Sequence, residues 1–236
     1  MSTRALHNPR SLSATLIALG CVAFGTSCFV ETEPVSSTAV EAEPKSPNPD
    51  HIWPPRVGER YPNLQLLNSR GERIALESLA GKIILVEPIG MDCPACNAFA
   101  GANRPGFSGF RGVKPQSGLP AIEEMLEAHA GGVSLSDDRI ALVHLLLYRP
   151  GRDGPPDVEM AQLWAKHFGI EESENMLILV GESYLIGSAS YNMIPGFQLI
   201  DADFVLRFDS SGHHPKHDLW RELLPAIPSL VKGSLL

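Results

Sequence analysis

The stretch that decides the fold reads Lys82-Ile83-Ile84-Leu85-Val86-Glu87-Pro88 and is followed, after four intervening residues, by Cys93-Pro94-Ala95-Cys96. The first segment is an almost unbroken apolar run, which is typical of a buried strand in a parallel sheet. In the second segment two cysteines are three positions apart, so in a helix they share one face and their sulfurs can bond. The sequence therefore predicts a central strand that leads into a helix opened by a dithiol.

The dithiol has the residue types that thiol chemistry requires. Pro94 suits the first helical position, where its missing N–H would have no intrahelical partner. Cys93 would then stand at the helix N-terminus, where free N–H groups and the helix dipole favour a thiolate. We therefore predict that Cys93 is the nucleophile and that Cys96 is the resolving thiol.

Two other interpretations of the pair are a structural disulfide and half of a zinc site. A four-cysteine zinc site needs a second pair, and the only other cysteines, Cys21 and Cys28, lie in the N-terminal segment. We favour the redox-active dithiol and predict neither a metal nor a cofactor at this site.

Composition excludes several classes of function. The chain has 236 residues, a formal net charge of -8 and no basic run, which argues against a nucleic-acid partner. Its four cysteines are too few for a domain held together by disulfides. The length allows one sizeable domain that folds on its own hydrophobic core.

The N-terminal segment is predicted to be a targeting signal. Residues 1–28 carry Arg4 and Arg10 and then an uncharged, mostly apolar run, which resembles a bacterial lipoprotein signal with lipid on Cys28 or Cys21. An uncleaved signal anchor is the alternative. Residues 29–55 are rich in Pro, Ser, Thr, Glu and Ala, which predicts a disordered tether. A lipoprotein signal and an uncleaved anchor would both place the domain, residues 56–236, outside the cytoplasm, in the periplasm or an equivalent compartment. Both would also anchor it to a membrane.

The pattern of the domain predicts an α/β fold with a mixed sheet and helices on both faces. The central strand should end at Pro88 and Gly90, and residues 103–120, which include Phe107 and Phe110, should form an inserted loop. These aromatic residues either shape a partner groove or pin the loop to the core. The predicted order is β-β-β-α-β-α-β-β-α. Strands are expected at 63–68, 73–76, 82–87, 140–148, 176–180, 198–200 and 204–208, and helices after the dithiol and at 121–130, 157–168 and 218–231.

Three segments together resemble the thioredoxin-like superfamily, especially its TlpA-like and alkyl-hydroperoxide-reductase-like branches. They are residues 71–82, which lead into the central strand, the Cys93-Pro94-Ala95-Cys96 motif, and residues 191–201, which hold a proline followed by Phe197-Gln198-Leu199-Ile200-Asp201. The resemblance spans roughly residues 57–231 and implies a thioredoxin-like fold with an insertion after the start of the dithiol helix.

The resemblance also implies roles for single residues. Pro195 matches the cis-proline that faces the dithiol and leaves the backbone of Ile194 free to pair with a substrate strand; an ordinary trans proline is the alternative. Glu87 matches a buried acid that accepts a proton from Cys96, the alternative being a solvated glutamate. Asp92 stands where thioredoxins commonly have tryptophan, and its charge is expected to raise the pKa of Cys93.

The function implied is a thiol–disulfide oxidoreductase that acts on protein disulfides outside the cytoplasm, with a possible membrane electron donor. A thiol peroxidase is one alternative, but that family has Thr or Ser at the position of Gly90. A copper chaperone of the Sco type is the other, although its cysteines are one residue further apart. His213, His214 and His217 would be its candidate histidines, unless they belong to a solvated loop.

Overall fold

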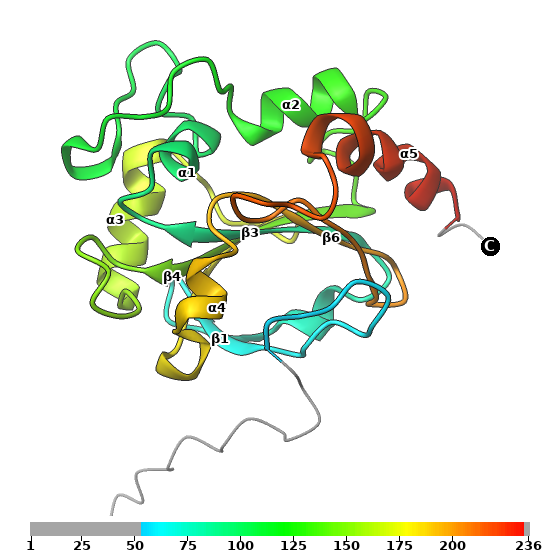
Figure 1. Cartoon of the computed structure of the whole chain (residues 1–236), viewed down its shortest axis with the longest axis horizontal. Coiled ribbons are helices and arrows are strands. Elements are labelled where there is room, and N and C mark those ends of the chain that lie inside the picture. The colour runs from blue at the N-terminus through cyan, green and yellow to red at the C-terminus, as the bar shows by residue number, and fades with distance from the viewer. Residues whose placement is uncertain (1–52, 234–236) are drawn as a thin grey trace, which may run out of the picture. The chain divides into compact units, whose positions relative to one another are not determined.

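The predicted central strand forms β3 (Ile83–Gly90) in a seven-stranded mixed sheet that is flanked by helices (Figure 1). The computed structural model describes residues 53–233. The strand order is β2-β1-β5-β4-β3-β6-β7, with β3, β4 and β5 parallel and β6 antiparallel to β3. The other strands are β1 (Gln65–Asn68), β2 (Arg73–Ala75), β4 (Ile140–Tyr148), β5 (Met176–Val180), β6 (Gln198–Ile200) and β7 (Leu206–Asp209).

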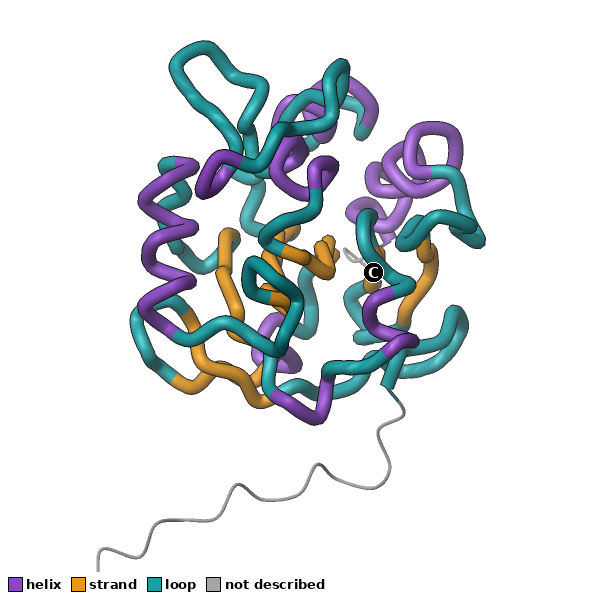
Figure 2. The backbone as a smooth tube through the Cα atoms, turned by 60° about the vertical axis from the view of Figure 1, so that its left-hand side comes forward, coloured by secondary structure: helices purple, strands orange, loops and turns teal. Residues whose placement is uncertain are grey.

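The α/β fold class predicted from the sequence is confirmed, and a strand is present at each of the seven places where one was expected. The predicted order of elements is wrong in one respect, because it counts two strands after the helix that follows β4, whereas β5, β6 and β7 all come there. Figure 2 shows the strands enclosed between helices and joined by long loops. The helices are α1 (Pro94–Phe99), α2 (Ile122–His129), α3 (Val158–Phe168), α4 (Ser188–Tyr191) and α5 (Leu224–Gly233), with short turns η1 (Leu76–Leu79), η2 (Phe110–Gly112), η3 (Ser183–Leu185) and η4 (Leu219–Leu223).

The prediction that β3 ends at Pro88 is wrong. The strand continues through Pro88 to Gly90 and stays paired with β4 as far as Tyr148. On its other side β3 pairs with β6 only over residues 84–86, so Pro88 lies where one side of the strand is unpaired. A proline is tolerated there because no ladder bond needs its N–H. The extra residues carry the strand up to the dithiol.

The two central strands have no exposed residue: every residue of β3 and β4 is buried. Helix α3 covers part of this core with Trp164 and Phe168, whose ring centroids are 4.6 Å apart. It begins at Asp157, whose side chain accepts a hydrogen bond from the N–H of Met160, and ends at Gly169 with φ 65°. Both residue types are common at these helix ends.

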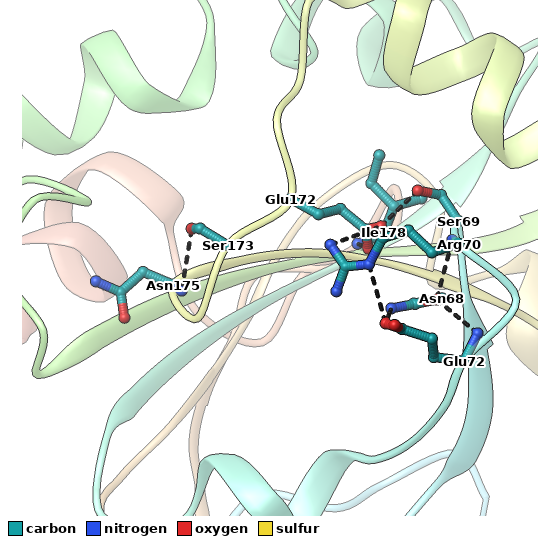
Figure 3. A network of polar contacts seen from close by, with 8 residues as sticks. All are labelled: Asn68, Ser69, Arg70, Glu72, Glu172, Ser173, Asn175 and Ile178. Atoms are coloured by element: carbon teal, nitrogen blue, oxygen red, sulfur yellow. Dashed lines mark hydrogen bonds and ion pairs between the residues drawn. The ribbon is translucent and has the colours of Figure 1, made fainter.

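A polar network fixes the N-terminal hairpin to the sheet (Figure 3). The side chain of Asn68 accepts hydrogen bonds from the backbone N–H groups of Arg70 and Glu72, both at 2.9 Å, and so closes the β1–β2 turn. The buried carboxylate of Glu172 accepts from Ser69 Oγ at 2.5 Å and from the N–H of Ile178 in β5 at 2.9 Å. The Glu172 side chain thus joins the hairpin turn to β5, and the network stabilises this part of the fold.

The final helix contains Pro225 and Pro228 and is irregular. It begins as a π-helical turn, η4, and continues as α5. Pro225 has no N–H to donate to the preceding turn, which accounts for the local departure from α-helical hydrogen bonding.

The N-terminal predictions lie outside the described residues. These are the signal segment 1–28 with Cys21 and Cys28, and nearly all of the tether 29–55. Within residues 53–233, no helix combines the length and the apolar character needed to span a bilayer.

Candidate active site

The dithiol lies where β3 meets α1, and its two thiols have different environments. Cys93 caps α1, its sulfur accepting a hydrogen bond from the N–H of Cys96 at 3.3 Å, and Pro94 occupies the first turn. Both cysteines are free thiols. Cys93 retains 8% of its surface exposed, whereas Cys96 has none. Only Cys93 is therefore placed to meet a substrate.

The surroundings shift the pKa values of the two thiols in opposite directions. A hydrogen bond from Cys96 is the main cause of a lowered pKa at Cys93; burial opposes it, and backbone N–H groups of Cys96 and Ala95 add to it. Burial raises the pKa of Cys96 well above its ordinary value, and the Cys93 thiolate and the Glu87 carboxylate raise it further. The first thiol is favoured as a thiolate and the second stays protonated until it reacts.

Glu87 is buried and faces a histidine that the sequence analysis did not single out. The side chains of Glu87 and His144 are 0% and 2% exposed, and Oε2 of the first lies 3.1 Å from Nδ1 of the second. Burial raises the pKa of Glu87, and His144 partly opposes that rise. The interpretation of Glu87 as a solvated strand-end residue is thus wrong, and the buried acid expected from the resemblance is present.

Asn97 fixes the conformation of the dithiol turn. Its buried amide Nδ2 donates to the carbonyls of Cys93 at 2.8 Å and Met91 at 3.1 Å, and its Oδ1 accepts from the N–H of Phe110 at 2.7 Å. The N–H of Gln116 also donates to the carbonyl of Pro94 at 2.9 Å. The loop between α1 and α2, residues 100–121, is therefore bonded directly to the turn that carries the nucleophile.

Of the two aromatic residues in this loop, Phe110 pins it to the core. Phe110 is 3% exposed and its ring lies 5.3 Å from that of Trp164 in α3, whereas Phe107 is 41% exposed. A Cβ on Gly109, next to Phe110, would stand 1.7 Å from the carbonyl oxygen of Val113, so only glycine fits there.

We expect Asn97→Ala to destabilise the protein by about 1–3 kcal/mol for each buried backbone group left without a partner. The carbonyl of Met91 and the N–H of Phe110 are the two groups affected. Chemical denaturation would measure the loss. Asn103→Ala is the matched control, because Asn103 is an exposed asparagine of the same loop that donates to Gln116 and Leu119. Equal losses in both variants would contradict this role.

The expected effect of Asp92 on Cys93 is not found. Asp92 forms an ion pair with Arg152, with Nε and Oδ2 3.1 Å apart, and the pKa of Cys93 is lowered rather than raised. Burial disfavours the charge on Arg152, but Asp92, Tyr191 and the Cys93 thiolate raise its pKa. The guanidinium lies 5.1 Å from the ring centroid of Tyr191 and also donates to its hydroxyl. Arg152 thus neutralises Asp92 beside the nucleophile.

Removing this cation should make Cys93 less reactive. We expect Arg152→Gln to raise the pKa of Cys93 and to slow its alkylation at mildly acid pH, by less than about tenfold because water screens a half-exposed charge. The rate of iodoacetamide labelling against pH would measure this. Arg149→Gln is the control, since Arg149 pairs with Asp153 in the same loop. An equal slowing in the control would contradict the assignment.

The Ile194–Pro195 peptide bond is cis, as the resemblance implied. A Cβ built on Gly90 would lie 3.7 Å from both Cys93 Cβ and Ile194 Cδ1, so the proline loop adjoins the nucleophile. The backbone of Ile194 is only partly free: its N–H donates to Tyr191 at 3.2 Å, while none of the hydrogen bonds among residues 53–233 engages its carbonyl. The carbonyl alone remains for a substrate strand.

The three histidines of the loop at residues 213–217 have different surroundings. His213 and His214 are exposed, and His217 Nδ1 accepts a hydrogen bond from the N–H of Asp209 while its ring packs 5.0 Å from Phe208. In the described part of the chain, no three His, Cys, Asp or Glu side chains come together in a way that could hold a metal ion. The histidine loop therefore gives no support to a copper site.

Three residues of the site were not found from the sequence: His144, Asn97 and Arg152. His144 was detectable as the one polar residue in the apolar run 140–148. Asn97 directly follows the second cysteine, but nothing in the sequence shows that its amide bonds a loop thirteen residues away. Arg152 carried no signal, because it approaches Asp92 only through the fold.

The sheet order and the position of the dithiol at the end of β3 agree with the α/β mixed sheet that the sequence predicted. No family model and no curated protein matches the chain. Several solved structures are similar at low sequence identity. An uncharacterized conserved protein from Geobacillus kaustophilus shares 15% identity over 75% of this chain and 83% of its own, with a TM-score of 0.48.

Two further similar structures are of proteins whose class or family is named. A secreted disulfide oxidoreductase from Mycobacterium tuberculosis, homologous to E. coli DsbE, shares 17% identity over 71% of this chain and 95% of its own, with a TM-score of 0.41. A SCO1/SenC family lipoprotein from Bacillus anthracis shares 15% identity over 71% and 92%, with a TM-score of 0.43.

Proposed function

We propose that this protein is a thiol–disulfide oxidoreductase of the thioredoxin-like superfamily that acts on protein disulfides. The observation that carries the proposal is the asymmetry of the dithiol. Cys93 is partly exposed, caps a helix and has a lowered pKa, whereas Cys96 is fully buried and has a raised pKa. A structural disulfide needs no such difference, while an attacking and a resolving thiol do.

The reaction proceeds in two exchanges. The Cys93 thiolate attacks one sulfur of the substrate disulfide, the substrate S–S bond breaks, and one substrate sulfur leaves as a thiolate. Cys96 then loses its proton and attacks Cys93, and the second substrate thiolate leaves. The substrate gains two electrons and the protein is left with a Cys93–Cys96 disulfide. Run in reverse, the same steps oxidise a dithiol.

The compartment and partners belong to the same proposal. The uncharged N-terminal run and its cysteines support export and a membrane tether, through lipid on Cys28 or Cys21 or through an uncleaved anchor. A reductase outside the cytoplasm requires an electron donor to reduce its disulfide again, and a membrane dithiol carrier is the class of partner that fits.

Insulin reduction by dithiothreitol tests this function, using the full-length chain. The wild-type protein should accelerate precipitation of the insulin B chain, and Cys93→Ser should reduce the rate to that of dithiothreitol alone. Substituting both Cys21 and Cys28 with serine is the control and should leave the acceleration unchanged. A wild-type protein that gave no acceleration, or a Cys93→Ser variant that kept it, would overturn the proposal.

A further inference from the structure

Two arginines beside the dithiol have a backbone conformation that favours glycine. Within residues 53–233, the residues other than glycine that have a positive φ are Arg111 (49°), Arg152 (64°) and Phe204 (63°). Phe204 is fully buried and packs on Tyr61, which explains its large side chain. Both arginines are exposed, so burial does not explain them. Because this conformation costs free energy for any residue except glycine, the two arginines point to a role outside folding.

Each of these guanidinium groups lies over an aromatic ring and has N–H groups to spare. Arg111 lies 5.6 Å from the ring centroid of Phe110, and Arg152 lies 5.1 Å from that of Tyr191. An exposed cation–π contact is weak and at best offsets the backbone cost. Within the described residues the side chain of Arg111 makes no hydrogen bond or ion pair. Asp92 engages Nε of Arg152 and the Tyr191 hydroxyl engages Nη1, which leaves Nη2 free. Both groups therefore have donors available to a ligand.

The loop that carries Arg111 is basic, although the protein is acidic. The chain has a net charge of -8, yet residues 93–121 contain Arg104, Arg111 and Lys114 and no acidic residue. Arg104 is neutralised by ion pairs with two glutamates of α2. Lys114 is exposed and, like Arg111, has no ion pair in the described part of the chain. Two uncompensated positive charges therefore lie in this loop.

These two charges are held against the dithiol helix. Both lie in the segment 110–116, which is bonded to α1 at each end. The N–H of Phe110 donates to Oδ1 of Asn97 at 2.7 Å, and the N–H of Gln116 donates to the carbonyl of Pro94 at 2.9 Å. The two accepting residues belong to the helix that the nucleophile begins. The segment and its cations therefore stay beside the nucleophile.

A third cation comes from a second loop. Strands β3 and β4 are parallel and end together, so the loop that follows β4 leaves the sheet at the end where the dithiol lies (Figure 1). This loop carries Arg152, whose Nε is 3.1 Å from Oδ2 of Asp92, the residue before Cys93. Two separate loops thus bring positive charge to the turn that holds the nucleophile.

We propose that Arg111, Lys114 and Arg152 form a basic docking surface that binds an acidic segment of the substrate protein next to its disulfide. This inference rests on the proposed function. Carboxylates of the substrate accept hydrogen bonds from the free guanidinium and ammonium groups, and such charged hydrogen bonds are among the stronger ones. Complementary charge also speeds the encounter of the two proteins. The surface therefore selects among disulfides by the charge that lies beside them.

Two synthetic peptides that share one disulfide can measure this selectivity. Both contain the same pair of cysteines, flanked by glutamates in one peptide and by lysines in the other. The full-length protein, with Cys21 and Cys28 replaced by serine, reduces each peptide under single-turnover conditions. Each rate constant is divided by that of mercaptoethanol, a neutral thiol, which corrects for the reactivity of the peptide itself. The ratio of the two corrected rates is insensitive to the reactivity of Cys93, because Cys93 attacks both peptides.

We expect the wild type to reduce the glutamate peptide about tenfold faster at low ionic strength, with a preference that shrinks as salt is added. Replacing Arg111 and Lys114 with glutamine should lower the ratio several-fold, and adding Arg152→Gln should bring it close to one. Lys232→Gln is the control, because it removes an exposed positive charge from α5, which lies well away from α1 (Figure 1). An equal fall in the control would mean that net charge, not this surface, sets the preference, and would contradict the inference.

A further variant tests whether Arg111 is kept for binding rather than for folding. Glycine suits the backbone conformation at this position, so Arg111→Gly should leave the midpoint of urea denaturation unchanged or raise it. The preference for the glutamate peptide should fall in the same variant. A clear drop in the midpoint would mean that the arginine stabilises the fold, and the inference would be overturned.

The outcomes separate failure of the inference from failure of the proposed function. If the wild type reduces both peptides at equal corrected rates, the inference is overturned and the oxidoreductase stands. If the wild type reduces neither peptide, both are overturned. Should the variants fail to fold, the salt dependence of the wild type decides. A preference for the glutamate peptide that stayed the same at high salt would contradict docking by charge.

Discussion

Replacing Cys96 with serine is expected to stop the reaction halfway, leaving the protein joined to its substrate by a disulfide through Cys93. The first exchange needs only Cys93, which is partly exposed and favoured as a thiolate. The second needs the buried sulfur of Cys96, which serine cannot replace. Turnover should fall to the uncatalysed rate while a covalent complex accumulates in nearly stoichiometric amount.

Non-reducing electrophoresis and mass spectrometry after mixing with a disulfide-bonded protein would detect this complex. Cys21 and Cys28 should be serine in every sample so that only the dithiol can react. Cys93→Ser is the matched control and should form no complex, because its remaining thiol is fully buried. Complex formation through Cys96 in that control would reverse the assignment of the two thiols.

The second large effect concerns stability and its dependence on pH. Burial raises the pKa of Glu87 above its usual 4.5, so the folded state holds the carboxyl proton more tightly than the unfolded state does. Its contribution to stability is full below the unfolded pKa and is lost as pH rises through the folded pKa. Substituting Glu87 and His144 together with leucine should remove this loss and stabilise the protein near neutral pH by about 1–4 kcal/mol.

Denaturation by urea at several pH values would measure the effect, with the gap between wild type and the double variant widening as pH rises from acid to neutral. The exposed pair Arg149 and Asp153, replaced by glutamine and asparagine, is the control and should leave the pH dependence unchanged. A double variant that was less stable than the wild type at neutral pH would contradict this account of the buried pair.

The elements predicted well are those whose signals are local. Helix α3 carries its own caps in Asp157 and Gly169, and β4 is a nine-residue run that is apolar except for His144. The dithiol was predicted from the spacing of its two cysteines, the proline between them and the apolar strand before them. Each of these signals lies within a dozen residues of sequence, and the structure keeps the local element that each signal favours.

The wrong or missing predictions concern contacts that only the fold creates. Pro88 could remain in β3 because β6 pairs with a shorter part of the strand, which its sequence does not show. Asp92 was expected to act on Cys93 alone, but Arg152 is brought to it from a loop sixty residues away. Likewise, the register of β3 against β4 decides that Glu87 meets His144. Register and loop placement were the missing information.

The central claim is that Cys93 and Cys96 form a reversible two-electron couple, and the reduction potential tests it most directly. The full-length protein would be equilibrated with mixtures of reduced and oxidised glutathione, with Cys21 and Cys28 replaced by serine, and its thiols counted by alkylation. We predict a single two-electron transition between roughly -270 mV, as in thioredoxin, and roughly -120 mV, as in a strong oxidant, that is absent in Cys93→Ser. A protein whose dithiol showed no reversible transition at any glutathione ratio would contradict the account.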